Sequence, residues 1–497
     1  MKQVAKYQFL NVDFAVIKFT VIAIFGLLAL ASLYFITQGN VLFALVCVVI
    51  PIPVYLFYLI FKYPKIGFIT SLYCNYFAIG LTRYVPAPLG LMVDASLVLT
   101  FVALIFSQFN QKVNWGLAAK DYTVWVIVWA IMTFLQLFNP EAISREAWFY
   151  AMRGYAVYSL FTVPLVYILF NKPKDFNSFI KMLAWFTLVA VAVGLKQKYI
   201  GLDPGEKKWL MIPGNYTTHL LFGQLRVFSI FADAGTYGSS MGYFGVLYII
   251  LGIHEKIRKD KYFFFFVGLM SLYAMMISGT RSAIAVPLVG FVVYTVLTKR
   301  FKVIVSVGVV LFAAFFFLKY TTIGQGNYDI RRMRSAFSED NASMNVRYEN
   351  RRMFAEYLST RPFGGGVGSA GNWGMRFTPG TFLAETATDG WYIQIWAEQG
   401  IVGLTFYLAM ILYIAIKSCF LIFFRLKKPE NINKAIGFTA GMFGLMVSSY
   451  TAASLGQMPN TIIVFTSMTL ISLMPQWEKL ESQTKDAESK ELILIKS

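Results

Sequence analysis

The chain has 497 residues, of which 57% are hydrophobic and only 14% are charged. Soluble domains carry about 25% charged residues, so this composition excludes an ordinary soluble enzyme and indicates a membrane protein. The net charge of +19 is explained in a membrane protein by cytoplasmic lysine and arginine, together with anionic lipid or a phosphate-bearing substrate. We therefore expect membrane lipid, and no nucleic acid, among the partners.

Apolar runs of about twenty residues recur along the chain, and each is long enough to cross a bilayer as a helix. The sequence therefore predicts an all-α, polytopic transmembrane bundle of about 12–14 spans. The candidate spans are 14–36, 41–61, 66–83, 89–106, 122–138, 155–170, 179–199, 236–253, 262–278, 282–298, 302–318, 401–424, 434–455 and 460–474. The first run is too long for a signal peptide and lacks a small-residue cleavage site.

The connecting segments predict the orientation. With the N-terminus in the cytoplasm, successive inside loops collect the lysines, as the positive-inside rule requires. Both termini are then cytoplasmic. The predicted organisation is transmembrane helices over 1–318 with an outer loop at 200–235, a long periplasmic loop with short helices over 319–398, C-terminal transmembrane helices over 399–475, and a fraying cytoplasmic tail over 476–497.

The long outer loop is rich in arginine on the side of the membrane where arginine is usually scarce. Guanidinium groups bind phosphate and carboxylate well, so we interpret this excess as a site for an anionic substrate. The alternative is a solvated loop whose arginines pair with its own acids, Asp329, Glu339, Asp340, Glu349 and Glu356. The loop arginines are Arg331, Arg332, Arg334, Arg347, Arg351, Arg352, Arg361 and Arg376.

Two local structures are predicted inside this loop. Residues 345–358 have helical composition, with Arg347, Arg351 and Phe354 on one face, and the helix should end before Pro362. The following run 364–368 is rich in glycine but lacks the Gly-Lys-Ser/Thr end of a phosphate-binding loop. A tight crossing near the membrane surface is therefore the favoured interpretation of these glycines.

Three residues of the outer face are candidates for chemistry: Arg226, Arg281 and Asp389. Arg281 joins two spans so closely that it is held at the bilayer boundary, where an unpaired charge costs on the order of a few kcal/mol. Its partner is either a lipid-linked phosphate or, by snorkelling, the lipid headgroups. Asp389 precedes a returning helix and serves either as a general base for a sugar hydroxyl or as a helix N-cap.

Other polar and aromatic residues leave alternatives open. His219 is a substitute base, and Asp94 inside a span is a functional candidate unless it lies beside Arg83 as a structural pair. The two histidines and three cysteines are too scattered for a metal site, so we expect no metal and no other cofactor. Six aromatic residues of the loop stack on sugar rings or form an interfacial belt: Trp373, Phe377, Phe382, Trp391, Tyr392 and Trp396.

Three segments in the second half of the chain resemble the motifs of one protein family. They are Ser278-Gly-Thr-Arg-Ser-Ala283, Arg361-Pro-Phe-Gly-Gly-Gly-Val-Gly368 and Thr388-Asp-Gly-Trp-Tyr-Ile-Gln-Ile-Trp-Ala-Glu-Gln-Gly-Ile-Val-Gly403. Their order and spacing across one long outer loop resemble the O-antigen ligase and O-antigen polymerase superfamily of bacterial inner membranes. The resemblance runs from Arg226 to the span after Gly403.

The resemblance implies a metal-independent glycosyltransferase of the membrane-embedded C type. Such an enzyme takes a glycan from undecaprenyl pyrophosphate at the periplasmic face and passes it to lipid A core, in ligases, or to another lipid-linked repeat unit, in polymerases. It further implies that Arg226 and Arg281 bind the donor pyrophosphate, with Arg281 also acting in catalysis. Arg347 matches a further arginine, and Arg351, on the same helix face, completes the predicted set.

One position departs from the family. A histidine assigned as catalytic base usually precedes the returning helix, and the aligned residue here is Asp389. An aspartate takes up a proton only weakly near neutral pH, so we expect Asp389 mainly to orient the acceptor hydroxyl. This departure slightly favours a polymerase over a ligase. The remaining alternatives are a lipid-linked glycan flippase, for which internal repeats would be expected, and a membrane scaffold.

Overall fold

The computed structural model describes residues 26–28, 30–38, 40, 47, 51–85, 87–109, 112–212, 214–221, 223–337 and 342–496. Within this part of the chain the fold is almost entirely helical, so the predicted all-α class is confirmed. The strands β1 (Leu220–Leu221) and β2 (Gln224–Leu225) form one short antiparallel hairpin. The predicted span 14–36 lies mostly outside the described residues, and of the span 41–61 the described part 51–61 falls in α3 (Pro51–Lys62).

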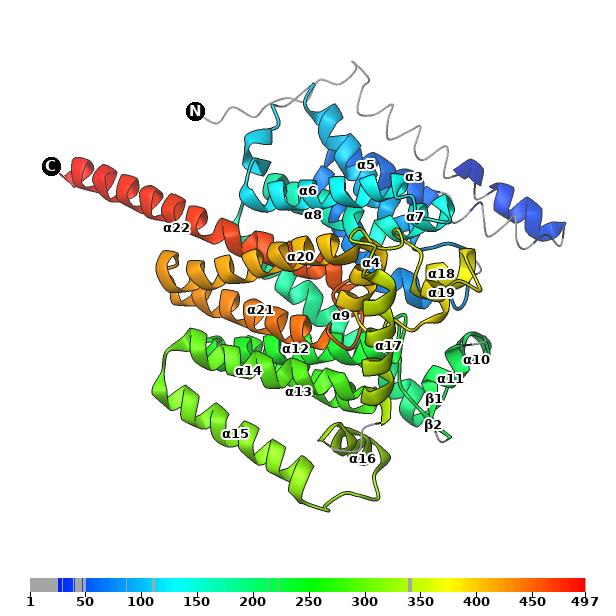
Figure 1. Cartoon of the computed structure of the whole chain (residues 1–497). Coiled ribbons are helices and arrows are strands. Elements are labelled where there is room, and N and C mark those ends of the chain that lie inside the picture. The colour runs from blue at the N-terminus through cyan, green and yellow to red at the C-terminus, as the bar shows by residue number, and fades with distance from the viewer. Residues whose placement is uncertain are drawn as a thin grey trace.

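The first half of the described chain is a series of helices with short connections (Figure 1). They are α3 (Pro51–Lys62), α4 (Pro64–Leu81), α5 (Leu91–Ser107), η1 (Trp115–Ala118), α6 (Asp121–Leu135), η2 (Gln136–Phe138), α7 (Arg145–Met152), η3 (Arg153–Val157), α8 (Tyr158–Leu169), α9 (Pro173–Tyr199), α10 (Pro204–Leu210) and α11 (Asn215–His219).

The second half follows the β1–β2 hairpin and contains the arginine-rich loop. Its helices are α12 (Ala234–His254), α13 (Arg258–Ile277), η4 (Arg281–Ile284), α14 (Ala285–Thr298), α15 (Phe301–Tyr320), α16 (Tyr328–Arg334), η5 (Ser335–Phe337), α17 (Ala342–Leu358), α18 (Gly371–Phe377), α19 (Phe382–Glu385), α20 (Trp391–Phe420), η6 (Leu421–Arg425), α21 (Pro429–Ser448) and α22 (Asn460–Lys496).

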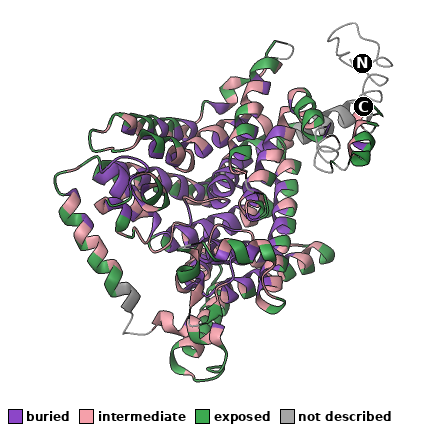
Figure 2. Cartoon of the chain, turned by 90° about the vertical axis from the view of Figure 1, so that its right-hand side faces the viewer, coloured by how far each residue is buried: buried purple, intermediate pink, exposed green. Residues whose placement is uncertain are grey.

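Each predicted span from residue 66 onward overlaps a helix of the structure, although the helix of the span 434–455 already ends at Ser448. Among the described residues, eight helical segments are long and apolar enough to cross a membrane: Asp121–Phe138, Arg145–Leu169, Pro173–Tyr199, Ala234–His254, Arg258–Ile277, Arg281–Thr298, Phe301–Tyr320 and Trp391–Arg425. Figure 2 shows that buried residues gather in the middle of this bundle. By contrast, α15 has no buried residue, so its apolar surface is available to lipid.

The returning helix α20 begins at Trp391, directly after Asp389 and Gly390 as expected, and the apolar residues of its first two turns pack into the core. The C-terminal tail differs from its prediction. The tail was expected to fray after Pro475, but α22 continues to Lys496. A proline removes one helical hydrogen bond and bends a helix without always ending it.

Polar contacts between loops show which loops lie at the same end of the bundle. Loops predicted on the lysine-rich side contact one another: the ammonium group of Lys65 lies 2.5 Å from the Asp175 carboxylate, and that of Lys181 lies 2.9 Å from Asp260. On the opposite end, the Tyr84 hydroxyl donates to Asp203 at 2.7 Å. These contacts agree with the predicted alternation of the helices, since segments assigned to one side meet on one side.

Helix α17 crosses the direction of the membrane helices, as Figure 1 shows. Its existence was predicted, but its apolar face was not: Phe354 and Leu358 are buried against Leu383 and Ile393. The helix therefore docks on α19 and the start of α20, while most of its polar residues stay exposed. This docking fixes where the arginines of α17 lie.

The glycine-rich segment 364–368 makes a tight crossing with α20. At Gly400 the helix is interrupted, with φ 65° and ψ −169°. The N–H groups of Gly365 and Gly366 donate to carbonyl oxygens of α20 just before this kink, at 2.9 Å each. The buried Glu398 carboxylate accepts the N–H of Gly368 at 2.9 Å. These N–H groups bond within the protein, as expected for turn geometry and not for a phosphate cradle.

We expect Gly400→Ala to lower the thermal unfolding midpoint of the detergent-purified protein clearly. A Cβ on Gly400 would lie 2.0 Å from the carbonyl oxygen of Pro362. Such crowding costs about 1–3 kcal/mol, in addition to about 1–2 kcal/mol for a side chain in the left-handed region. Gly380→Ala is the matched control, because Gly380 has φ +81° but open space around it. Equal thermal unfolding midpoints for Gly400→Ala and Gly380→Ala would mean that segment 364–368 does not pack tightly against α20.

Candidate functional site: an arginine-lined turn

The turn between α13 and α14 is the centre around which the candidate residues gather. Gly279 has φ +61° and lets the chain reverse within a few residues. Arg332 of α16 donates from Nε to the carbonyl oxygen of Gly279 at 3.1 Å. Arg226 donates from Nη2 to the hydroxyl of Thr280 at 3.0 Å. Two arginines from distant segments therefore bracket the turn that carries Arg281.

The segment that carries Arg226 is itself firmly held. Arg226 donates from Nη1 to the carbonyl oxygen of Thr218 at 2.9 Å. Arg83, just after α4, donates to the carbonyl oxygens of Ser229 and Phe231, and its guanidinium lies 4.5 Å from the centre of the Phe228 ring. The backbone beside Arg226 is thereby fixed to α4 by a buried cation.

Like charges accumulate at this turn. Burial, followed by the positive charge of Arg332, lowers the pKa of Arg226 below its usual value. Arg281 lies close enough to Arg332 and Arg347 for their charges to act on it. Bringing such cations together in a partly desolvated place is unfavourable, and a bound anion would offset that cost. The arrangement therefore favours a multiply charged anionic ligand.

Asp389 lies at the entry to α20 and contacts α17, the helix that carries Arg347. Its carboxylate is 3.9 Å from Nε of Arg347 and accepts a hydrogen bond from Asn350 at 3.4 Å, so both contacts come from α17. The residue has a left-handed backbone, with φ +40°. The N-cap of α20 is Gly390, without a side-chain capping hydrogen bond. The alternative interpretation of Asp389 as the N-cap is therefore wrong, since its carboxylate points to α17.

Arg351 occupies a different environment from the arginines of the turn. It donates from Nη2 to the carbonyl oxygen of Tyr450 at 3.2 Å and from Nη1 to the Tyr450 hydroxyl. Its guanidinium lies 4.0 Å from the centre of the Tyr450 ring. Much of its donor capacity is engaged by that tyrosine, so its predicted part in pyrophosphate binding stays a prediction.

The other polar candidates have structural partners. Nδ1 of His219 bonds to the carbonyl oxygen of Asn215 at 2.9 Å, its Nε2 accepts the N–H of Ala234 at 3.3 Å, and burial lowers its pKa. Asp94 does not lie beside Arg83, as the sequence had allowed. It pairs with Arg153 of η3 at 2.9 Å, because the π-turn at Arg153 brings that side chain to α5.

In the alternative interpretation, the arginines of the loop pair with acids of the same loop. The ion pairs of the structure test this in part. Asp329 pairs with Lys198 of α9 at 2.8 Å and not with a loop arginine. Arg361 pairs with Glu141 at 2.9 Å. Glu339 and Asp340 lie outside the described residues. Of the described acids, Asp329 and Glu141 thus pair away from the turn, whereas Asp389 lies 3.9 Å from Arg347.

Residues 265–408 match the O-antigen ligase family. This match confirms the resemblance seen in the sequence, over a stretch that includes Arg281, Arg332, Arg347 and Asp389 but not Arg226. Residues 265–408 are thus similar to a family whose members are glycosyltransferase-like enzymes. No curated protein matches the chain.

Two contributors to the site were not singled out from the sequence. Arg332 was one of eight loop arginines with no local feature to distinguish it, and only its contact with Gly279 does so. Asn350, which contacts Asp389, lies one turn along from Arg347 on α17. Helical spacing from Arg347 could have placed Asn350 beside it, but not beside Asp389.

Proposed function

We propose that this protein transfers a glycan from undecaprenyl pyrophosphate to an acceptor glycan at the periplasmic face of the bacterial inner membrane. The observation that carries the proposal is the gathering of Arg226, Arg281 and Arg332 at one turn. Arg347, whose charge acts on Arg281, lies 3.9 Å from Asp389. Fixed guanidinium groups match the geometry and the charge of a diphosphate. The match to the O-antigen ligase family supports a lipid-linked glycan as the substrate class.

The proposed reaction is a displacement at the anomeric carbon of the donor sugar. The acceptor hydroxyl oxygen forms a bond to that carbon while the bond from carbon to the diphosphate oxygen breaks. The electron pair leaves with the diphosphate, whose developing charge the arginines stabilise. Asp389 orients the hydroxyl and receives its proton late in the step. No metal ion is required in this scheme, because the guanidinium groups neutralise the leaving group.

We further propose that the acceptor is another lipid-linked repeat unit, which makes the protein a polymerase. The aspartate at position 389, where ligases usually carry a histidine, supports this choice. Arg347 and Asn350 hold that carboxylate toward α17, where it is suited to orient a neutral hydroxyl. Lipid A core is the acceptor in the alternative proposal of a ligase.

Reconstitution in vesicles tests these proposals. The purified protein is supplied with undecaprenyl-pyrophosphate-linked repeat units, with or without lipid A core, and the products are separated by size. We expect glycan chains longer than one repeat unit in the absence of lipid A core. Transfer only when lipid A core is present would make the protein a ligase. Movement of the lipid-linked glycan across the vesicle without any transfer would instead indicate a flippase.

A further inference from the structure

A second candidate site lies between α7 and α18. It is a pocket of about 530 Å³, a volume within the range of small-molecule sites. None of the arginines of the turn lines it. Its lining residues are Arg145, Glu146, Phe149, Tyr150, Arg376 and Phe377.

The pocket is built on stacked aromatic rings. The ring centre of Tyr150 lies 5.1 Å from that of Trp373 and 5.3 Å from that of Phe377, with interplanar angles of 22° and 19°. The guanidinium of Arg376 lies 5.1 Å from the Phe377 ring centre. Nearly parallel rings present flat faces of negative partial charge. The C–H groups of a sugar ring carry the complementary partial charge and shape.

These rings differ from the other aromatic residues of the loop. Trp391 is 4% exposed in the core, and Phe382 stacks on Tyr357 against α17. The rings of Trp373 and Phe377 are only partly buried, and Phe149 at the pocket is 54% exposed. Of these aromatic residues of the loop, Phe377 therefore lines the open pocket, whereas Trp373 packs between it and the core.

Charged groups surround the open pocket. Arg145, Glu146 and Arg376 are all exposed and line the same space as Tyr150 and Phe377. Three charged side chains are not expected around an aromatic residue that faces lipid acyl chains. A sugar, in contrast, offers an apolar ring face for stacking and hydroxyl groups for a carboxylate and for guanidinium groups. The combination of flat rings and charged groups is thus suited to a saccharide.

The pocket is linked to the proposed reaction site through the chain. Helix α18 packs against both α7 and α19, and the three residues after α19 lead to Asp389. In Figure 1, α16 lies toward the start of α17, and α18 and α19 lie toward its end. A glycan that reacts beside Asp389 can extend in this direction, away from the arginine turn.

We propose that the pocket between α7 and α18 is a saccharide subsite. It holds a sugar ring of the glycan substrate some distance from the bond that is made at Asp389. The nature of the glycan rests on the proposed function, whereas binding of a saccharide to this pocket does not require transfer. The subsite would favour longer glycans, because only these reach both Asp389 and the pocket.

The test is a binding measurement with the oligosaccharide released from the lipid-linked substrate by mild acid, which lacks the diphosphate. Saturation-transfer NMR reports contact of sugar C–H groups with aromatic rings in the detergent-purified protein. We expect Tyr150→Ala and Phe377→Ala to raise the dissociation constant about five- to tenfold, as loss of a stacking ring allows. Tyr150→Phe keeps the ring and should bind as the wild type does.

Further variants keep the test decisive. Phe149→Ala removes an exposed ring of the pocket and is expected to fold and to weaken binding, should the more buried variants fail to fold. Arg281→Ala should leave binding of the free oligosaccharide unchanged, since this probe has no diphosphate. Unchanged affinity in the folded ring variants would overturn the subsite. A wild-type protein that binds the oligosaccharide but transfers no glycan would overturn the proposed function alone.

Discussion

Arg281→Ala is expected to lower the rate of glycan transfer by about 100- to 1000-fold, the effect of removing one fixed group that stabilises developing charge. The protein should still insert and fold, because Arg281 is only half-buried and lies in the short turn η4. Initial rates in vesicles and thermal unfolding in detergent measure the two effects separately. Arg281→Lys should recover part of the activity, since it keeps the charge but not the planar fork.

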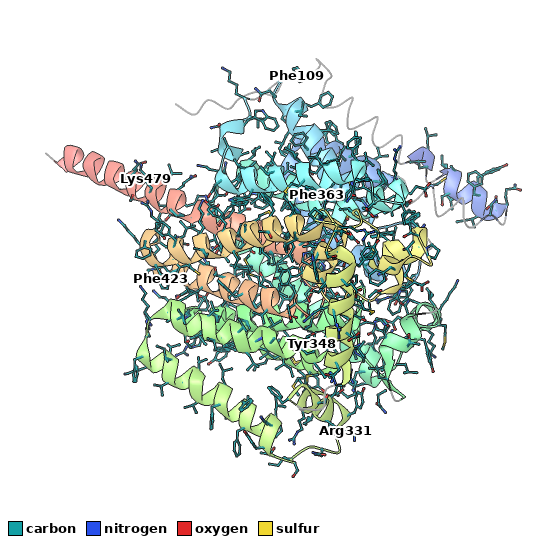
Figure 3. The ribbon with its side chains drawn as sticks, viewed as in Figure 1. Phe109, Arg331, Tyr348, Phe363, Phe423 and Lys479 are labelled. Atoms are coloured by element: carbon teal, nitrogen blue, oxygen red, sulfur yellow. The ribbon has the colours of Figure 1, made fainter. Side chains whose placement is uncertain are left out.

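Arg331→Ala is the matched control for Arg281. Arg331 belongs to the same loop and directly precedes Arg332, but it is exposed, and Figure 3 shows it at the edge of the molecule on α16. It should retain near wild-type activity. If the two alanine variants lose the same amount of activity, the effect is one of overall loop charge and not of a site at the turn.

Asp389→Asn is expected to reduce turnover at least tenfold, in line with the contribution of a positioned acid or base. Asparagine has the same shape and tolerates the left-handed backbone of this position. The folded structure should therefore persist while the carboxylate is lost. The rate of transfer at saturating donor and the thermal unfolding midpoint are the quantities to compare.

Glu385→Gln serves as the control for this change. Glu385 is exposed, lies in the same loop, and accepts the N–H of Gly380 at 3.1 Å. Its substitution should leave the rate of transfer unchanged. A lower unfolding midpoint for Asp389→Asn with a normal rate would assign Asp389 a structural role only, through its contacts with Arg347 and Asn350.

The sequence predicted those features that depend on local chemistry. Apolar runs predicted the helices, helical composition and Pro362 predicted α17, and the glycine run predicted a tight crossing. Arg281 was recognised as a position of interest because an unpaired charge at the bilayer boundary is costly, and Arg226 because it precedes a span on the outer face. The contacts between loops agree with the predicted alternation of spans.

The sequence could not predict which side chains meet across the fold. Arg351 shares a helix face with Arg347, yet Tyr450, about a hundred residues later, engages it. Arg332 is set apart from its neighbours only by its contact with Gly279. Likewise, Tyr150 joins Trp373 and Phe377 from a helix more than two hundred residues earlier. Such long-range pairings are set by tertiary packing, which leaves no periodic signal in the chain.

The most direct test of the account is the affinity of the purified protein for undecaprenyl pyrophosphate compared with undecaprenyl phosphate. A cluster of guanidinium groups at the turn predicts tighter binding of the diphosphate, and loss of that preference in the Arg226→Ala/Arg281→Ala double variant. Equal affinity of the wild type for the two lipids, or a preference that survives in the double variant, would contradict a diphosphate site at the turn.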